Sequence, residues 1–301
     1  MIDLLRDLIF DYTLRNVALG SALLGIVSGA LGTFAVLRRQ GLLGDALTHA
    51  ALPGICLAFM LTGEKTPILL MLGAAVSGWL GTLCLMYIIR HTVLDEDAAL
   101  GIVLSVFFGF GIVLLTFLQR SGNANQAGLD KYLFGQAATL VAESVTTMSI
   151  LGAFALAVVF LLYKEFKLIT FDSSFAASIG FGASWVNILL TFLIVIAVVI
   201  GLQTVGVVLM AAMLIGPAAA ARQWTNRLDH MILISSAFGA LSGVGGALVS
   251  VTESRLPTGP MIILVLTLIV AISFAFGSAR GLVWDWLNNR NRKLMPPEEI
   301  A

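Results

Sequence analysis

The sequence predicts an all-α protein, a single polytopic bundle of eight or nine membrane-spanning helices. Three observations lead to this prediction. Of the 301 residues, 59% are hydrophobic and only 11% are charged, whereas soluble domains carry about 25% charged residues. The mean hydropathy is high, at +1.00. Apolar stretches of about 18–24 residues recur along the chain, and each is long enough to cross the hydrocarbon core of a bilayer as a helix.

The predicted spans follow one another closely. Most have the length that a helix rising about 1.5 Å per residue needs to cross about 30 Å of hydrocarbon. The sixth and seventh spans are shorter and are joined by Leu202-Gln203-Thr204, so the seventh is a candidate half-helix. In chain order the spans are 16–37, 42–62, 67–89, 98–118, 140–163, 185–202, 204–221, 231–251 and 260–278.

The Lys and Arg residues predict the orientation, because they concentrate on the cytoplasmic side of membrane proteins. With nine spans and the C-terminus inside, 11 of the 17 Lys and Arg residues fall on the inner side and 6 on the outer side. The N-terminus is then outside, and merging two spans would move it inside. The net charge is zero, which gives no indication of a nucleic-acid partner.

The chain is predicted to form one domain. We expect an N-terminal segment at 1–15, a transmembrane domain at 16–280 and a cytoplasmic tail at 281–301. Acidic residues near the start, such as Asp3 and Asp7, do not suit a cleaved signal peptide. The Gly-x-x-x-Gly patterns at 25–29 and 239–243 predict tight helix packing, with a dimer seam as the alternative.

Asp45 and His49 are an acid and an imidazole four residues apart inside an apolar span. On a helix this spacing places both side chains on one face, about one turn apart. A carboxylate in hydrocarbon is costly unless it is paired, and a divalent transition-metal ion suits both ligand types. The pair therefore indicates a metal pathway. Alternatively, the two side chains bond only each other, or Asp45 caps the helix or pairs with Arg38 or Arg39.

Two neighbours of this pair are candidates for a further contribution. Pro53 has no N–H, so the carbonyl oxygen of His49 loses its usual helical donor and is available to water or to the ion. Cys56 lies seven residues after His49 on roughly the same stripe, where a thiolate would favour soft metals. Packing is the preferred interpretation of Cys56, and of Cys84, since both lie in apolar runs.

Several catalytic motifs are absent from the sequence. It contains no Gly-x-x-x-x-Gly-Lys-Ser/Thr loop for ATP, no His-Glu-x-x-His and no Gly-x-Ser-x-Gly. The sequence thus gives no sign of an ATPase, a zinc protease or an acyl hydrolase, and we do not expect an enzyme.

Three segments follow one another in an informative order. The first is GDALTHAALPG at 44–54, the second is FDSSFAASIG at 171–180, and the third is VGVVLMAAMLIGPAAAAR at 205–222 with LPTGP at 256–260. Together they resemble the permease subunits of bacterial manganese, zinc and iron ABC importers, over roughly 15–280. A more distant likeness to cobalamin and siderophore permeases implies the type II importer architecture, here without their first span.

The resemblance implies a set of partners. The permease would be a homodimer in the bacterial plasma membrane, with two cytoplasmic ATP-binding cassette ATPase subunits beneath it. An extracellular or periplasmic metal-binding protein would deliver the ion, and the outer loop 120–131 is the candidate contact for it. In such a homodimer, two copies each of Asp45 and His49 would supply four oxygen and nitrogen ligands around a two-fold axis. The ion would be cargo, and no permanently bound cofactor is expected.

The segment 217–229 resembles the coupling helix that seats in the ATPase, and the alternative is an ordinary loop between helices. A second short helix on the same side, 171–182, is a weaker candidate for ATPase contact, with Asp172 as its N-cap. The predicted coupling residues are Pro217, Arg222, Gln223, Arg227 and Asp229.

The function that these observations predict is a permease subunit of an ATP-driven importer of divalent transition-metal ions, with manganese preferred. Zinc or iron import by the same machinery is the alternative, because carboxylate and imidazole ligands accept all three ions. A different class also stays open, namely an ATP-independent secondary transporter or channel, which would need no docking helix.

Overall fold

The computed structural model describes residues 11–64, 66–120, 135, 140–252 and 256–283. Every element within these residues is a helix, which confirms the predicted all-α class. Most of the N-terminal segment, most of the cytoplasmic tail and nearly all of the outer loop 120–131 lie outside the described residues, so the predictions made for them remain predictions.

The helices are close to the predicted spans. Eight are long and apolar enough to cross a membrane, and α11 is a shorter apolar helix of 16 residues, which rises about 24 Å. The described helices are α2 (Tyr12–Leu37), α3 (Gly41–Thr62), α4 (Pro67–His91), α5 (Glu96–Arg120), α7 (Ala142–Leu161), α8 (Tyr163–Phe171), α9 (Ser173–Ser178), α10 (Ala183–Thr204), α11 (Val207–Arg222), α12 (Leu228–Thr252) and α13 (Thr258–Phe276).

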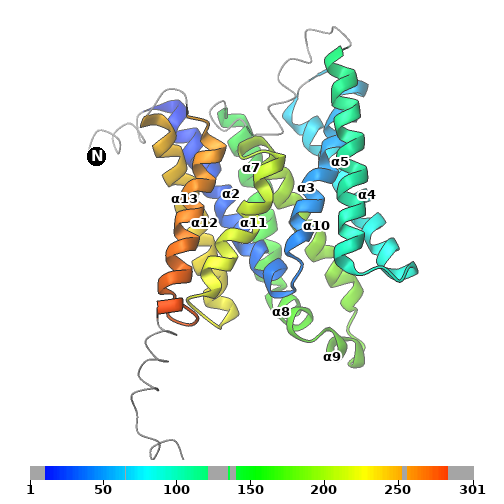
Figure 1. Ribbon diagram of the computed structural model, residues 1–301, viewed down its shortest axis with the longest axis vertical. Helices are drawn as coiled ribbons and strands as arrows, with labels where there is room; N and C mark the ends of the chain where they lie inside the picture. Colours follow the sequence, from blue (N-terminus) through cyan, green and yellow to red (C-terminus); the bar gives the residue numbers. More distant parts are fainter. Residues whose placement is uncertain (1–10, 65, 121–134, 136–139, 253–255, 284–301) are drawn as a thin grey trace, which may run out of the picture.

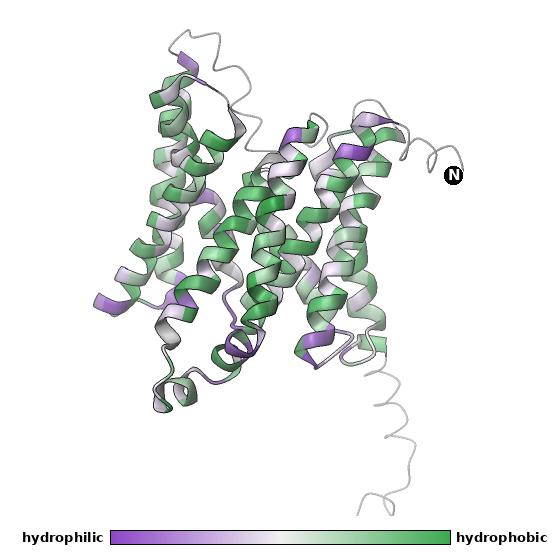
Figure 2. Ribbon diagram, turned by 180° about the vertical axis from the view of Figure 1, so that it is seen from behind, coloured by the Kyte–Doolittle hydropathy of each residue, from purple (hydrophilic) through white to green (hydrophobic). Residues whose placement is uncertain are grey.

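The path of the chain favours nine passes over eight. Figure 1 shows α11 running back along the bundle in the opposite direction to α10. The first turn of α2 and the last turn of α13 consequently lie at opposite ends. Polar residues gather toward the ends of the helices, and apolar residues cover their middles (Figure 2). This is the pattern expected of a bundle that spans a bilayer.

The turn between α10 and α11 explains why the seventh span is short. Val205 and Val207, on either side of Gly206, are fully buried, so the chain reverses inside the protein rather than at its surface. Gly206 has φ 87° and ψ 171°, a backbone conformation that is essentially restricted to glycine. The hydroxyl of Thr204 donates to the carbonyl oxygen of Gly201 at 3.1 Å, which satisfies that polar group within the turn.

The two Gly-x-x-x-Gly patterns pack against each other within one protomer. A Cβ on Gly25 would lie 2.1 Å from the carbonyl oxygen of Gly239, and one on Gly29 would lie 2.5 Å from that of Ser235. The Ser235 hydroxyl also donates to the carbonyl oxygen of Gly29 at 2.8 Å. The patterns therefore join α2 to α12 as an antiparallel pair, which confirms the tight-packing interpretation.

α3 is held in place by equally close contacts with α4 and α5. A Cβ on Gly54 of α3 would lie 2.0 Å from the carbonyl oxygen of Gly73 of α4. The Ser77 hydroxyl donates to the carbonyl oxygen of Ala50 at 2.6 Å, and the Cys56 thiol lies 3.8 Å from the carbonyl oxygen of Gly111 on α5. These contacts fix which face of α3 points toward α5.

Candidate functional site

Asp45 and His49 lie in the first half of α3, well inside the helix. The helix begins at Gly41 with Gln40 as its N-cap residue, so Asp45 is not the N-cap. The only ion pair of Asp45 within the described part of the chain is with His49. Arg38 is close to a different acid, since burial lowers the pKa of Arg38 and the Glu96 carboxylate opposes that shift. The capping and arginine-pairing alternatives are therefore wrong.

Asp45 and His49 are not joined by a strong hydrogen bond. His49 Nε2 lies 3.4 Å from Asp45 Oδ1, which is longer than a good hydrogen bond between these atoms. The His49 side chain is 14% exposed and the Asp45 side chain 35% exposed. The imidazole also packs edge-on against Phe108 of α5, with ring centroids 4.5 Å apart. The Phe108 ring thus orients the imidazole of His49, and the Asp45 carboxylate is the more exposed of the two groups.

The second nitrogen of this imidazole is unusual. His49 Nδ1 is buried and has no hydrogen-bond partner, and a buried polar atom without a partner is uncommon. Metal-bound imidazoles normally have their other nitrogen held by a hydrogen bond. In His49 neither nitrogen is held by a strong hydrogen bond, and Nε2 is the nitrogen that faces Asp45.

One chain offers only two of the ligands that a metal ion needs. Within the described residues no group of three or more His, Cys, Asp or Glu side chains is close enough to hold an ion. Cys56 is 1% exposed, and its thiol faces the carbonyl oxygen of Gly111. This supports the packing interpretation of Cys56. The pair is therefore at most half of a coordination sphere.

The predicted coupling segment 217–229 does not form one separate helix. Pro217 lies inside α11 and is buried, and Arg222 is the last residue of that helix. A short turn follows, and α12 begins at Leu228. Gln223 is 9% exposed. The side chains of Arg227 and Asp229 are 70% and 45% exposed.

The turn after α11 is fastened to the end of α13. The carbonyl oxygen of Gln223 accepts from the backbone N–H of Ala279 at 2.9 Å. The carbonyl oxygen of Trp224 accepts from the hydroxyl of Ser278 at 3.1 Å. The turn between α11 and α12 is therefore also held by the residues that directly follow α13.

The helices α8 and α9 form a hairpin at the same end (Figure 1). Asp172 Oδ1 accepts from the backbone N–H of Phe175 at 2.8 Å and from the hydroxyl of Ser174 at 2.8 Å, so Asp172 is the predicted N-cap of α9. The Phe175 N–H and the Ser174 hydroxyl hold the pKa of Asp172 below its ordinary value. Phe171, Phe175 and Ile179 are 61%, 52% and 57% exposed, and Figure 1 shows the hairpin projecting beyond the other helices.

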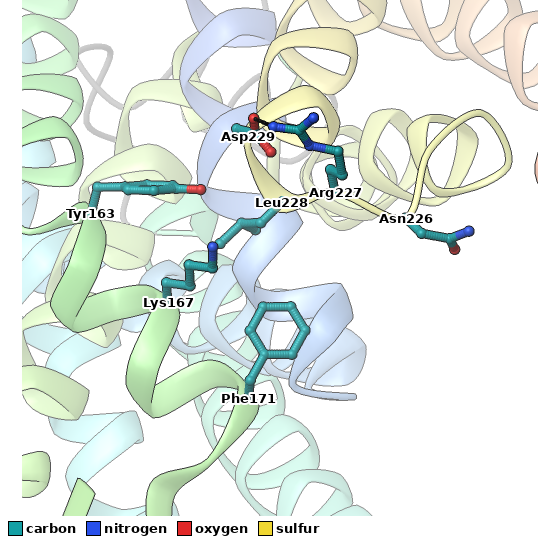
Figure 3. A pocket seen from close by; sticks show the side chains of 7 residues that line it. All are labelled: Tyr163, Lys167, Phe171, Asn226, Arg227, Leu228 and Asp229. Carbon is teal, nitrogen blue, oxygen red and sulfur yellow. Dashed lines mark hydrogen bonds and ion pairs between the residues drawn. The ribbon is translucent and has the colours of Figure 1, made fainter.

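A notch separates this hairpin from the turn after α11. It has a volume of about 420 Å³ and is lined by Tyr163, Lys167 and Phe171 of α8 and by residues 226–229 at the start of α12. Figure 3 shows Tyr163 and Lys167 reaching across from α8 toward Leu228, beside the pair formed by Arg227 and Asp229. That pair has an N–O distance of 3.0 Å.

Sequence reasoning missed Tyr163 and Lys167 as site residues. The signal was present, because Phe166 and Ile169 are three residues apart and both are buried, while Lys167 between them is exposed. This is the spacing of a short amphipathic helix. The notch itself carried no sequence signal, because its two walls lie about 60 residues apart in the chain.

Comparison with known proteins agrees with this arrangement. The model of the ABC 3 transport family matches residues 10–277. The chain is 49% identical over 294 residues to the zinc transport system membrane protein TroC of Treponema pallidum (strain Nichols), covering 98% of this chain and 99% of that protein. It is 52% identical over 266 residues to the manganese transport system membrane protein MntC of Bacillus subtilis (strain 168), covering 88% of this chain but only 61% of that longer protein.

A solved structure is similar over nearly the whole fold. It is that of PsaBC from Streptococcus pneumoniae in complex with a Fab, with a TM-score of 0.82 and 32% sequence identity, covering 93% of this chain and 98% of that one. The family match covers residues 10–277, including the segment that carries Asp45 and His49, and the relative from Treponema pallidum and the solved structure cover nearly the whole chain. The chain therefore belongs to the ABC 3 transport family and is a metal-type ABC transporter permease.

Proposed function

We propose that this permease imports a divalent transition-metal ion, preferably manganese, and that separate ATPase subunits drive the transport. The Asp45–His49 pair is the observation that carries the proposal. A carboxylate and an imidazole 3.4 Å apart lie inside an apolar span, where such groups are costly and usually functional. The imidazole has a buried nitrogen with no partner. The ion is the transported substrate rather than a resident cofactor.

A homodimer completes the site. One protomer brings an oxygen and a nitrogen ligand, which is too few for a transition-metal ion. A two-fold axis beside α3 would bring a second Asp45 and a second His49 to the same point. The resulting two oxygens and two nitrogens would hold an ion without a cysteine, at a strength that still permits release. The carbonyl oxygen of His49, which Pro53 leaves without its helical donor, is a further ligand available there.

Manganese is supported over zinc by the oxygen half of this ligand set. Carboxylates suit Mn²⁺, whereas imidazole suits zinc and iron equally well. The names of the two relatives, one a zinc and one a manganese transport protein, allow either metal. Zinc and iron are therefore the competing ions in any test.

The ATPase contact is proposed at the end of the bundle that carries α9. There the exposed Phe171 and Phe175 give the projecting hairpin an apolar surface that a partner would cover. Arg227 and Asp229 provide a neighbouring charged surface. The opposite end of the bundle would receive the ion from an extracellular or periplasmic binding protein at the bacterial plasma membrane. We propose the α8–α9 hairpin as the main contact and the turn after α11 as the second.

Uptake of radioactive manganese into liposomes tests this function. The permease is reconstituted with its cognate ATPase and binding protein, with zinc and iron as competitors. We expect uptake that requires ATP and that unlabelled manganese suppresses better than zinc or iron does. Suppression chiefly by zinc would change the preferred ion. Uptake without any ATPase would instead establish a secondary carrier.

Replacing Asp172 tests the role of α9. In Asp172→Ala the N–H of Phe175 loses its acceptor, so α9 should fray and retain less ATPase during copurification. Asp172→Asn keeps a capping oxygen and should behave as the wild type does. The carboxylate cap contributes above its depressed pKa and is lost as the pH falls through that value, so both variants should be compared at neutral pH. Faster amide exchange at Phe175 in the alanine variant, without loss of ATPase, would argue against this docking role.

A further inference from the structure

The notch between α8 and the start of α12 is a cavity with two facing walls. Tyr163, Lys167 and Phe171 are spaced four residues apart on α8, so they line one face of that helix. Residues 226–229 form the facing wall, and the two walls enclose about 420 Å³. Tyr163 and Lys167 point across this space in Figure 3.

Both walls of the notch are anchored in the core. On one side, Phe166 of α8 is fully buried and meets Phe34 of α2 in an edge-to-face contact with centroids 5.8 Å apart. On the other side, the turn before α12 is fastened to α13 through the carbonyl oxygen of Gln223. A partner that enters the notch would therefore meet a preformed surface, and binding would lose little entropy to the ordering of loops.

The charges in the notch do not balance. Lys167 has no ion pair among the described residues, while Arg227 pairs with Asp229 at 3.0 Å. Burial and the nearby Asp229 carboxylate raise the pKa of Tyr163, which places the phenol beside the same acid. Two cations thus face one carboxylate. One additional negative charge would neutralise the set, and a cation would be repelled.

We propose that the notch receives a carboxylate side chain, Asp or Glu, from the ATPase subunit, between the Lys167 ammonium and the Arg227 guanidinium. This inference rests on the proposed function, because the partner is the ATPase of that function. The notch adjoins the hairpin proposed as the main ATPase contact, and Phe171 belongs to both. The carboxylate would fix the register of the ATPase against the α8–α9 hairpin, as charges do in other interfaces.

The position of the notch favours a protein carboxylate over a lipid phosphate. α8 packs against the inner end of α2 through Phe34, and α2 is the most buried of the candidate spans. α12 is the antiparallel partner of α2. Both walls therefore adjoin α2, the most buried span, at the end of the bundle where the ATPase is proposed to dock.

The test is the affinity of the detergent-solubilised permease for its purified ATPase, measured at low and at high salt. Lys167→Glu should weaken binding at least about tenfold, which is typical of a disrupted interfacial charge pair. Lys167→Gln should weaken binding less, and the affinity of this variant should depend less on salt than that of the wild type. Arg15→Glu is the control, because it reverses the charge of an exposed cation in the first turn of α2, at the opposite end of the bundle from the notch. We expect it to bind within about twofold of the wild type.

A charge exchange identifies the partner residue. Surface Asp and Glu residues of the ATPase are changed one at a time to Lys, and one of these changes should restore binding to the Lys167→Glu permease. Equal affinity of the Lys167→Glu permease and of the control permease for the ATPase would overturn the proposal. A second result would also overturn it: the Lys167→Glu permease binds the ATPase normally in detergent but loses uptake only in liposomes that contain anionic phospholipid. That result would assign the notch to a lipid headgroup. If the wild-type permease neither binds the ATPase nor requires ATP, the proposed function itself fails. This outcome differs from failure of the notch proposal, in which the wild type still binds the ATPase.

Discussion

Metal uptake should be lost in both Asp45→Asn and His49→Ala, with a decrease of at least about 100-fold. Removal of a residue that merely supports a metal ligand costs about 10–100-fold in affinity or activity, and removal of a ligand should cost no less. In the proposed two-fold dimer each substitution acts twice, so two of the four proposed ligands disappear together. Asp45→Asn preserves the shape of the side chain and removes its charge, which separates coordination from packing.

The measurement is ATP-dependent uptake of radioactive manganese by reconstituted complexes. His91→Ala and Asp97→Asn are matched controls, because both residues are exposed at the turn between α4 and α5 and the same functional groups are removed there. We expect these two variants to transport within about twofold of the wild type, as surface substitutions usually leave the fold unperturbed.

Equilibrium binding of Mn²⁺ to the purified permease distinguishes a ligand from a purely structural pair. If Asp45 and His49 only stabilise each other, both substitutions should lower the thermal stability and leave metal binding by the folded fraction unchanged. If they are ligands, the metal-free stability should change little and metal binding should disappear. Full uptake by either variant would remove the pair from the transport pathway.

The spans were predictable because hydropathy alone determines which segments cross a bilayer. The apolar runs ended within a few residues of the observed helix ends, as at 42–62 against Gly41–Thr62. The proximity of Asp45 and His49 was equally predictable, because a four-residue spacing on a helix is a local property. The orientation of His49 against Phe108 was not predictable, since it depends on how α3 packs against α5.

The inner end of the bundle was harder to predict. The coupling helix was predicted to begin at Pro217, but a proline is tolerated inside a membrane helix when its neighbours compensate, and α11 continues to Arg222. The short helix α8 was not expected, although the spacing of Phe166 and Ile169 is that of a short amphipathic helix. Its position depends on the buried contact between Phe166 and Phe34, which joins parts of the chain that no local pattern connects.

Gly25→Ala should strongly destabilise the contact between α2 and α12. The added Cβ would lie 2.1 Å from the carbonyl oxygen of Gly239 and 2.2 Å from its carbonyl carbon. Both atoms belong to the backbone, so no side chain can turn aside, and α2 and α12 must separate. Overpacking of a core typically costs about 1–3 kcal/mol and occasionally more, and a clash between two backbones belongs at the upper end. Separation would also lengthen the hydrogen bond from Ser236 to Ile26, now 3.2 Å.

The same substitution at Gly78 of α4 provides the control. A Cβ there would meet only the Val195 side chain at 3.7 Å and the carbonyl oxygen of Leu47 at 3.8 Å, which are ordinary van der Waals distances. Because alanine favours a helix over glycine by about 1 kcal/mol, Gly78→Ala should be neutral or slightly stabilising. Thermal unfolding of the two purified variants in one detergent measures the difference. Since both changes add one methyl group to a buried helix, equal unfolding temperatures would mean that α2 and α12 do not approach each other closely enough for their glycines to be required.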